Sequence, residues 1–399
     1  MVSQGKIIFI LLIFLLFPAC NTNSDVKNNK DVSINNKNSK LHSESEYKKL
    51  LSYMKTLSYK KAENSIKTLL AKYPKNAELF YLYAVMTKNI KPDPLEAIKI
   101  LQVTVQLDDK YGDAWKLLGD LYFIRKEYKN ALKSWELAIE SIKNNGTLYY
   151  RLANLYYSQK DYKPAIKYFT KSLKIDDKLE WSYYYLAEIY FRALRKPEKG
   201  IEYLKKGLKI LPKSKNLNQK LAIFYYDTEK YKEAIKWNKE VLKIINYDNF
   251  AIENISDAYM QLKNYDKAIE WLDKIIKEQP KSVYYIKKKA DIYIIDKKFK
   301  EAVELLEFAY RLKNDSELKS KIAKLYLTMG NKEKYQEMVK ELKNSDNPND
   351  RRVGEYLRLD GKNANSLDYV PASDIHLDDK QDLKQSPRKN SGKKTINKK

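Results

Sequence analysis

GDAWKLLGDLYFIRKEYKNALKSWELAIESIKNN, residues 112–145, is the stretch of sequence that decides the fold. Its first half places apolar and small residues at the i, i+3, i+4, i+7 spacing of a buried helical stripe, at Trp115, Leu118, Gly119 and Tyr122. Its second half repeats this kind of stripe, at Tyr128, Ala131, Leu132, Trp135 and Ala138. The stretch therefore predicts a helix, a turn and a second helix.

Small and large residues alternate in this hairpin for a steric reason. Gly119, Ala131 and Ala138 stand where helices approach closely, while Trp115 and Trp135 fill the space between them. One such hairpin cannot bury its apolar face alone, so several must stack. The order Trp-x-x-Leu-Gly-x-x-Tyr, then Ala, a bulky residue and Ala, resembles the tetratricopeptide (TPR) repeat, whose period is about 34 residues.

Related units follow one another in register along most of the chain. The resemblance implies an all-α fold, an α-solenoid of about nine TPR-like helix-turn-helix repeats. The predicted array covers 43–349, with repeats 43–76, 77–111, 112–145, 146–179, 180–214, 215–248, 249–282, 283–315 and 316–349. The last is degenerate, because Tyr335 takes the place of the usual small residue. Two repeats carry one extra residue, expected in the turn beside Pro92 and Pro94 and in the turn beside Pro197.

Composition agrees with a helical array. The chain has 399 residues, of which 43% are hydrophobic, so it can bury a sizeable core. Only 10 glycines and 11 prolines occur, which disfavours a turn-rich β fold.

Residues 1–19 read as a targeting segment. Lys6 precedes an unbroken apolar run over residues 7–17, which is too short to span a bilayer but suits a signal peptide. The run ends in LLFPAC, which resembles a lipobox and implies that Cys20 is lipidated at the start of the mature protein. The alternative is an ordinary secretory signal with a coincidental cysteine. With its repeats, the chain resembles a spirochaete-type TPR lipoprotein of a bacterial cell envelope.

Two polar segments flank the predicted array. Residues 20–42 are rich in Asn, Ser and Lys and predict a flexible tether. Residues 350–399 predict a short helix, at about 351–359, followed by a disordered basic tail.

Catalysis is not expected. Cys20 is the one cysteine, so neither an intramolecular disulfide nor a cysteine-based metal site can form. The two histidines, His42 and His376, both fall in predicted flexible segments. The sequence has no Gly-rich phosphate loop, nucleophile elbow or cluster at metal-ligand spacing. We therefore predict a protein that is not an enzyme and uses no cofactor, metal or small-molecule substrate.

The resemblance implies a concave groove lined by the first helix of each repeat, with positions nine and twelve pointing inward. These positions give a polar or acidic row beside an aromatic row, and neighbouring aromatic residues add to it. The predicted protein-binding residues are Asp120, Phe123, Tyr150, Asn154, Tyr157, Trp181, Tyr184, Glu188, Phe191, Tyr226, Asp257 and Asp291. Such a surface suits an extended peptide or a partner helix. The alternative is that these aromatic side chains pack between repeats. The carboxylate clamp of chaperone-binding TPR domains is not reproduced.

The formal net charge of the chain is +25. Without Lys6, the tether and the tail, roughly +18 remains on residues 43–349. This excess either forms a solvated helical face, with lysines such as Lys171 and Lys206, or attracts anionic lipid, acidic envelope polymer or nucleic acid. Because exported proteins meet little nucleic acid, no nucleic-acid partner is expected.

Together these features predict a non-catalytic scaffold, lipid-anchored on the periplasmic face or at the cell surface, that binds other envelope proteins or clients. The outer-membrane protein assembly machinery contains a shorter lipoprotein with the same elements, so envelope assembly or biogenesis is the first hypothesis. A second is a surface-exposed adhesin that binds acidic polymers through its basic face. A third is a cytosolic, nucleic-acid-associated TPR protein, which requires that the lipobox interpretation be wrong.

Overall fold

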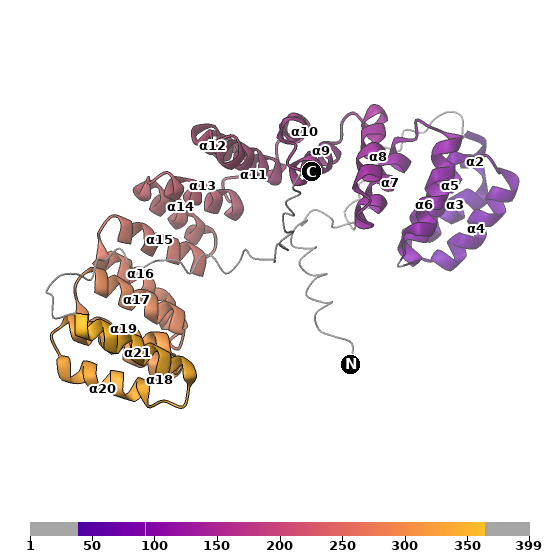
Figure 1. The fold of residues 1–399 in the computed structure, drawn as a ribbon. Coiled ribbons are helices and arrows are strands. Elements are labelled where there is room, and N and C mark those ends of the chain that lie inside the picture. The colour runs from indigo at the N-terminus through magenta and orange to yellow at the C-terminus, as the bar shows by residue number, and fades with distance from the viewer. Residues whose placement is uncertain (1–38, 92, 364–399) are drawn as a thin grey trace, which may run out of the picture. The chain divides into compact units, whose positions relative to one another are not determined.

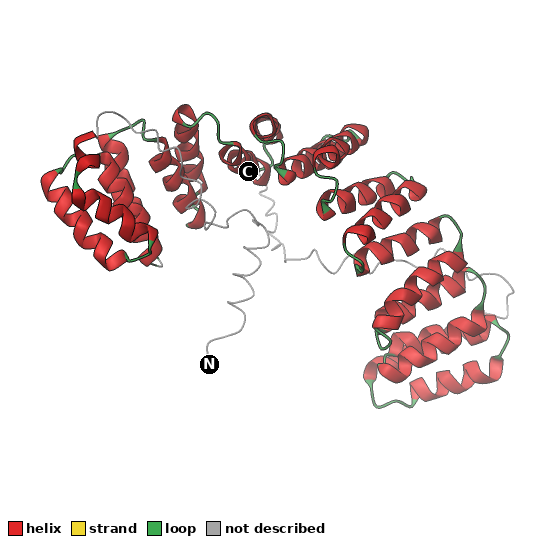
Figure 2. Cartoon of the chain, turned by 180° about the vertical axis from the view of Figure 1, so that it is seen from behind, coloured by secondary structure: helices red, strands yellow, loops and turns green. Residues whose placement is uncertain are grey.

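The computed structural model describes residues 39–91 and 93–363, and within them every regular element is a helix (Figure 2). The chain divides into two compact units, with the boundary between Ser214 and Lys215. The predicted helix-turn-helix fold is confirmed.

The first unit contains the helices up to α12 (Figure 1). They are α2 (Ser39–Ser43), α3 (Ser45–Lys55), α4 (Tyr59–Lys72), α5 (Ala77–Ile90), α6 (Leu95–Leu107), α7 (Gly112–Ile124), α8 (Tyr128–Ser141), α9 (Gly146–Ser158), α10 (Tyr162–Ile175), α11 (Glu180–Glu188), the π-helix η2 (Ile189–Ala193) and α12 (Pro197–Ile210).

The second unit contains the helices from α13 onward. They are α13 (Lys215–Asp227), α14 (Tyr231–Ile244), α15 (Asn249–Gln261), α16 (Tyr265–Glu278), α17 (Val283–Ile295), α18 (Phe299–Leu312), α19 (Ser316–Thr328), α20 (Lys332–Lys343) and α21 (Pro348–Asn363). From the second repeat to the ninth, the first helix begins at the residue that opens the predicted repeat, from Ala77 to Ser316.

The small-residue position of the third repeat shows how a hairpin closes. A Cβ atom on Gly119 of α7 would lie 2.2 Å from Cδ1 of Trp135 on α8. Trp135 is itself buried and donates a hydrogen bond from its indole nitrogen to Asp120 at 3.0 Å. The glycine therefore makes room for a large ring that is fixed at both its apolar and its polar end.

We expect Gly119→Ala to lower the free energy of unfolding by about 1–3 kcal/mol, because the added methyl group overpacks the helix contact. The urea midpoint of the purified chain, followed by circular dichroism, measures this loss. A second variant, Gly119→Ala with Trp135→Leu, should be more stable than Trp135→Leu alone or equal to it, because the clash is then absent. A wild-type midpoint for Gly119→Ala would contradict the steric explanation.

Seven of the described turns between paired helices hold a residue other than glycine in the left-handed region. These residues have φ between 54° and 63° and are Leu57, Lys126, Lys160, Arg195, Glu229, Lys263 and Lys297. In the third repeat, the amides of Lys126 and Glu127 donate to the carbonyls of Phe123 and Tyr122, which caps the end of α7. The ninth repeat has Gly330 at this place, with φ 76°.

Because a side chain at positive φ is strained, Lys126→Gly is expected to stabilise the hairpin by up to about 1 kcal/mol. Gly330→Ala should have the opposite effect. Lys133→Gly is the matched control, since this exposed site lies inside α8, where glycine costs about 1 kcal/mol. Thermal midpoints of the three variants test the argument, and a destabilised Lys126→Gly would refute it.

In the fifth repeat, the prediction that the extra residue lies in the turn is wrong. The residue is accommodated inside the first helix, where α11 continues as the π-helix η2 and the amide of Leu194 donates to the carbonyl of Ile189. A Cβ atom on Gly200 of α12 would lie 2.9 Å from both the Ala187 carbonyl oxygen and Phe191 Cβ. The wider π turn thus explains why this repeat has glycine where its neighbours have alanine.

At the N-terminal end, the prediction of a flexible segment up to His42 is wrong for its last residues. The helix α2 covers Ser39–Ser43, and Leu41 is buried in a core with Tyr47 and Leu50. His42 Nε2 lies 2.9 Å from the buried carboxylate of Glu78. A single apolar residue thus fixes this short helix. The rest of the predicted tether lies outside the described residues.

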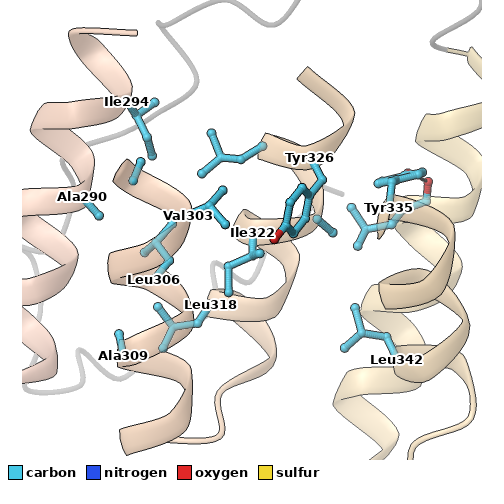
Figure 3. Packing of buried hydrophobic residues seen from close by; sticks show 14 of the residues in the cluster. Ala290, Ile294, Val303, Leu306, Ala309, Leu318, Ile322, Tyr326, Tyr335 and Leu342 are labelled. Carbon is cyan, nitrogen blue, oxygen red and sulfur yellow. Dashed lines mark hydrogen bonds between the residues drawn. The ribbon is translucent and has the colours of Figure 1, made fainter. Parts of the chain in front are cut away.

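The C-terminal core of the second unit joins buried residues of α17, α18, α19 and α20 (Figure 3). It also includes Leu357 of α21, a helix that is longer than the one predicted at 351–359. Leu357 is fully buried, and the hydroxyl of Tyr335 donates to its carbonyl oxygen. The large residue in the small-residue position of the ninth repeat therefore packs against a capping helix rather than against a further repeat. The remainder of the predicted tail, including His376, lies outside the described residues.

Candidate functional site

The predicted groove residues of the fourth and fifth repeats lie on α9 and α11, except Phe191, which lies on the π-helix η2. Trp181 and Tyr184 have ring centroids 5.2 Å apart, and both side chains are partly exposed. Tyr157 of α9 is also partly exposed, and its ring centroid lies 4.9 Å from that of Tyr185. These helices therefore bring Tyr157, Trp181 and Tyr184 together around Tyr185. We call Tyr157, Trp181, Tyr184 and Tyr185 the aromatic surface.

Tyr185 is the central residue that the sequence prediction omitted. Its ring stacks on the buried Phe169 of α10 at 5.6 Å and lies 5.5 Å from the ring of Tyr184. It occupies position six of its repeat, whereas the prediction used positions nine and twelve and a few neighbouring aromatic residues that included Trp181 and Tyr184. Because Phe169 supports Tyr185 from below, the partly exposed rings above it are held in fixed positions.

Two residues of the predicted groove are buried instead. Tyr150 is 5% exposed and packs against Phe169 and Tyr185. Asn154 is 8% exposed. Tyr150 therefore packs between helices, as the alternative interpretation expected. Neither Tyr150 nor Asn154 exposes enough surface to contact a ligand appreciably.

Glu188 provides a carboxylate at the edge of the aromatic surface. Its side chain is 12% exposed, and Oε2 lies 3.4 Å from Nε of Arg192, one turn further along the helix. Burial raises the pKa of Tyr157 to about 12, and the negative charge of Glu188 adds to the rise. The site thus combines apolar rings, a protonated phenol and one carboxylate.

This raised pKa predicts a loss of stability at alkaline pH. The unfolded chain ionises Tyr157 near its ordinary value of 10.0, before the folded chain does. The stability that the neutral phenol contributes is complete below about pH 10 and is lost as the pH rises to about 12. We expect Tyr157→Phe to lose less stability than the wild type over this range, as measured by urea midpoints. An identical alkaline loss in both proteins would contradict the assignment.

In the third repeat, the predicted acidic position is neutralised. Asp120 Oδ1 lies 2.5 Å from Nη1 of Arg151, on the first helix of the next repeat, and accepts the hydrogen bond of Trp135. The ring of Phe123 packs at 5.6 Å from both Tyr128 and Trp135. Asp120 and Phe123 therefore mainly hold α7, α8 and α9 together.

The second unit repeats this cross-repeat pairing. Lys288 lies 2.8 Å from Asp257 and 2.5 Å from Glu253, and Lys321 pairs with Asp291. In each case the carboxylate at position nine meets a cation at position six of the following repeat. The expected acidic row is thus largely an ion-pair ladder, and a search for a cation 30 or 31 residues after each acid would have found it.

Phe191 and Tyr226, the last two predicted aromatic residues, belong to different units. In the first unit the guanidinium carbon of Arg192 lies 5.8 Å from the ring centroid of Phe191. In the second unit Tyr226 packs edge-on against Tyr231 at 5.3 Å, and burial raises its pKa to about 12. Tyr226 also packs against the cluster of Ile255 and Ala258 on α15, the first helix of the next repeat.

Other types of site are not found in the part of the chain that the structure describes. In residues 39–91 and 93–363, no three His, Cys, Asp or Glu side chains gather as metal ligands. Nor does any described helix combine the length and the hydropathy needed to cross a membrane. Cys20, the predicted lipidation site, lies outside these residues.

Comparison with known proteins identifies the repeats. Residues 147–179 and residues 251–282 each match the tetratricopeptide repeat family. No curated protein matches the sequence of the chain.

Several solved structures similar to this chain are TPR proteins. The C-terminal part of a TPR repeat-containing protein from Cytophaga hutchinsonii has a TM-score of 0.51 and 15% identity, over 59% of this chain and 95% of that one. A tetratricopeptide repeat protein from Parabacteroides merdae has a TM-score of 0.42 and 17% identity, over 63% and 98% of the two chains. PilF from Pseudomonas aeruginosa has a TM-score of 0.41 and 16% identity, over 52% of this chain and 94% of that one. The chain therefore contains tetratricopeptide repeats and folds as an α-solenoid built from them.

Proposed function

We propose that this chain is a membrane-anchored interaction scaffold that binds an extended peptide or a helix of an envelope protein through the aromatic surface. TPR proteins generally bind other proteins, and their fold is typically non-catalytic. The observation that carries the proposal is the group of partly exposed rings of Tyr157, Trp181 and Tyr184, supported by Tyr185 and Phe169. Rigid aromatic side chains bury a large area on binding at little cost in side-chain entropy.

The chemistry of the site indicates what the partner should present. The rings favour apolar or aromatic side chains, and the carboxylate of Glu188 favours a hydrogen-bond donor or a cation close to them. The neutral phenol of Tyr157 can both donate and accept a hydrogen bond at physiological pH. A short segment with apolar anchors and one basic or amide side chain fits these requirements.

The location is proposed from the sequence. The apolar run at residues 7–17 and the LLFPAC sequence support export and lipidation at Cys20. An anchored scaffold would meet other envelope proteins, so assembly or biogenesis of the envelope is the proposed role. Cys20→Ser should move the chain from the membrane fraction to the soluble fraction after signal cleavage, or leave an uncleaved precursor. If this variant were acylated and found in the membrane fraction like the wild type, the proposal of a lipid anchor at Cys20 would be contradicted.

The binding proposal is tested by a pull-down from detergent-solubilised membranes. The test variant is Trp181→Ala with Tyr184→Ala. The matched control is Phe250→Ala with Tyr284→Ala, which removes two rings that are 47% and 50% exposed in the second unit. Circular dichroism checks that both variants remain helical. Loss of a defined protein with the test variant alone supports the proposal, whereas equal recovery by both variants would overturn it.

A further inference from the structure

The second helix of the fourth repeat, α10, carries a stripe of lysines. Lys163, Lys167, Lys171 and Lys174 follow one another at intervals of four, four and three residues, so they lie on one side of the helix. All four side chains are exposed, and α10 contains no acidic residue. Among the described residues, none of the four lysines forms an ion pair.

The same helical positions in other repeats do not carry such a stripe. In α8 they are Lys129, Lys133, Leu137 and Glu140, and in α16 they are Asp266, Glu270, Lys274 and Lys277. The fold therefore does not require lysine at these positions, because apolar and acidic residues occupy them elsewhere. A row of four like charges is mutually repulsive, and no acidic residue on α10 offsets this repulsion.

The neighbouring helix α12 extends the basic area. Tyr203 of α12 packs against the hydrophobic cluster that contains Ala165 and Phe169 of α10, which places α12 next to this part of the first unit. On α12, Lys199, Lys206 and Ile210 are exposed at the i, i+7, i+11 spacing of one side of the helix. Glu202 lies on the same side and pairs with Lys206 at 2.6 Å, so the charge of Lys206 is partly neutralised. Ile210 is 42% exposed, so an apolar side chain stands among the charges.

We propose that this lysine face, formed by the four lysines of α10 with Lys199, Lys206 and Ile210 of α12, docks on the anionic headgroups of a membrane. The inference rests on the lipid anchor of the proposed function, which would keep the array close to such a surface. Docking would orient the array, because a flexible tether alone leaves it free to rotate. A polybasic surface added to a lipid anchor also strengthens membrane attachment.

The residue types favour lipid over an acidic polysaccharide or nucleic acid. The seven residues of the lysine face include no arginine, whose planar fork suits specific phosphate or carboxylate recognition. Tyr149, the ring below Lys171, is 1% exposed and cannot stack on a sugar or a base. Flexible lysines with an exposed isoleucine suit a headgroup layer, into which the apolar side chain can insert.

The effect should be large enough to measure. Each lysine near an anionic surface contributes roughly a fivefold preference for the docked state at physiological ionic strength. Loss of all four lysines of α10 should therefore weaken docking on the order of a hundredfold or more. High salt should have a similar effect, since it screens exposed charges.

The test reconstitutes the full-length lipidated protein into vesicles and measures lysine acylation by a water-soluble amine reagent, residue by residue. One set of vesicles is phosphatidylcholine, and the other contains phosphatidylglycerol as well. Flotation with the neutral vesicles measures attachment through the lipid anchor alone. A protein that lacks a working anchor is therefore distinguished from one that is anchored but does not dock through the lysine face. The reporters are Lys199 and Lys206, which remain in every variant.

The test variant replaces Lys163, Lys167, Lys171 and Lys174 with glutamine. The matched control replaces Lys60, Lys61, Lys67 and Lys72 of α4, which removes the same charge from another second helix of the first unit. We expect anionic vesicles to protect the reporters in the wild type and in the control, and this protection to disappear in the test variant and at high salt.

Three results would overturn the proposal. They are equal reactivity of the reporters in neutral and anionic vesicles, unchanged protection in the test variant, and protection by soluble polyglutamate as strong as that by anionic vesicles. The last result would assign the face to an acidic polymer instead of lipid.

Discussion

Leu357→Ala is expected to open the C-terminal end of the second unit. Leu357 is fully buried in a core with Tyr335 and Leu342, and α21 packs against α19 and α20. Truncating a buried leucine costs about 2–5 kcal/mol, which is the sum of the lost transfer free energy and the cavity left behind. In a repeat array the loss falls on the neighbouring elements and is not shared by the whole chain.

Hydrogen exchange measures this effect helix by helix. Amides of α20 and α21 should exchange faster in Leu357→Ala by a factor of about 30 or more, while the helices of the first unit keep their wild-type rates. Tyr356→Ala is the matched control, because the adjacent side chain is 59% exposed and should leave the rates nearly unchanged. Wild-type protection of α21 in Leu357→Ala would show that this helix does not cap the array.

Lys288→Ala is expected to have the second large effect. The ammonium group of Lys288 lies between Glu253 and Asp257, and its side chain is only 17% exposed. Removing it takes the shared cation from two partly buried carboxylates, which should cost about 1–3 kcal/mol after allowance for solvent screening. Lys288→Met keeps an apolar side chain of similar length, so the stability that this variant loses measures the effect of the charge alone.

The pH dependence distinguishes lost charge from lost packing. Without the lysine, the two carboxylates repel each other while both are charged. The penalty should therefore be full at neutral pH and smaller near pH 4, about the ordinary pKa of carboxyl groups. Urea midpoints of Lys288→Met and the wild type at both pH values check this. A penalty independent of pH would mean that Lys288 acts through packing.

The sequence was sufficient to predict the repeats because their packing is local. Gly119 and Trp135 belong to one hairpin, so the steric demand between them is visible within a single period. The two ends were harder to predict, since each depends on a few residues without a repeating pattern. Leu41 is the one apolar anchor of α2, and Leu357 anchors α21 in a segment with little periodicity.

The candidate site was predicted only in part, for a physical reason. Position numbers within a repeat indicate which way a side chain points, but they do not indicate what it meets. Asp120, predicted as a groove residue, is neutralised by Arg151 of the next repeat. Tyr150 is covered by Phe169 and Tyr185, so the prediction included a core residue and omitted the ring at the centre of the aromatic surface. Such pairings depend on contacts between repeats.

Site-specific photocrosslinking in living cells tests the central claim most directly. A benzoylphenylalanine replaces Tyr184 on the aromatic surface, and in a separate strain it replaces Tyr284 of the second unit, which is 50% exposed and thus more accessible than the partly exposed Tyr184. The account predicts a defined protein adduct from position 184 that is absent from position 284 and disappears with Trp181→Ala. No adduct at position 184, or the same adducts from both positions, would contradict the claim that the aromatic surface is where this scaffold binds its partner.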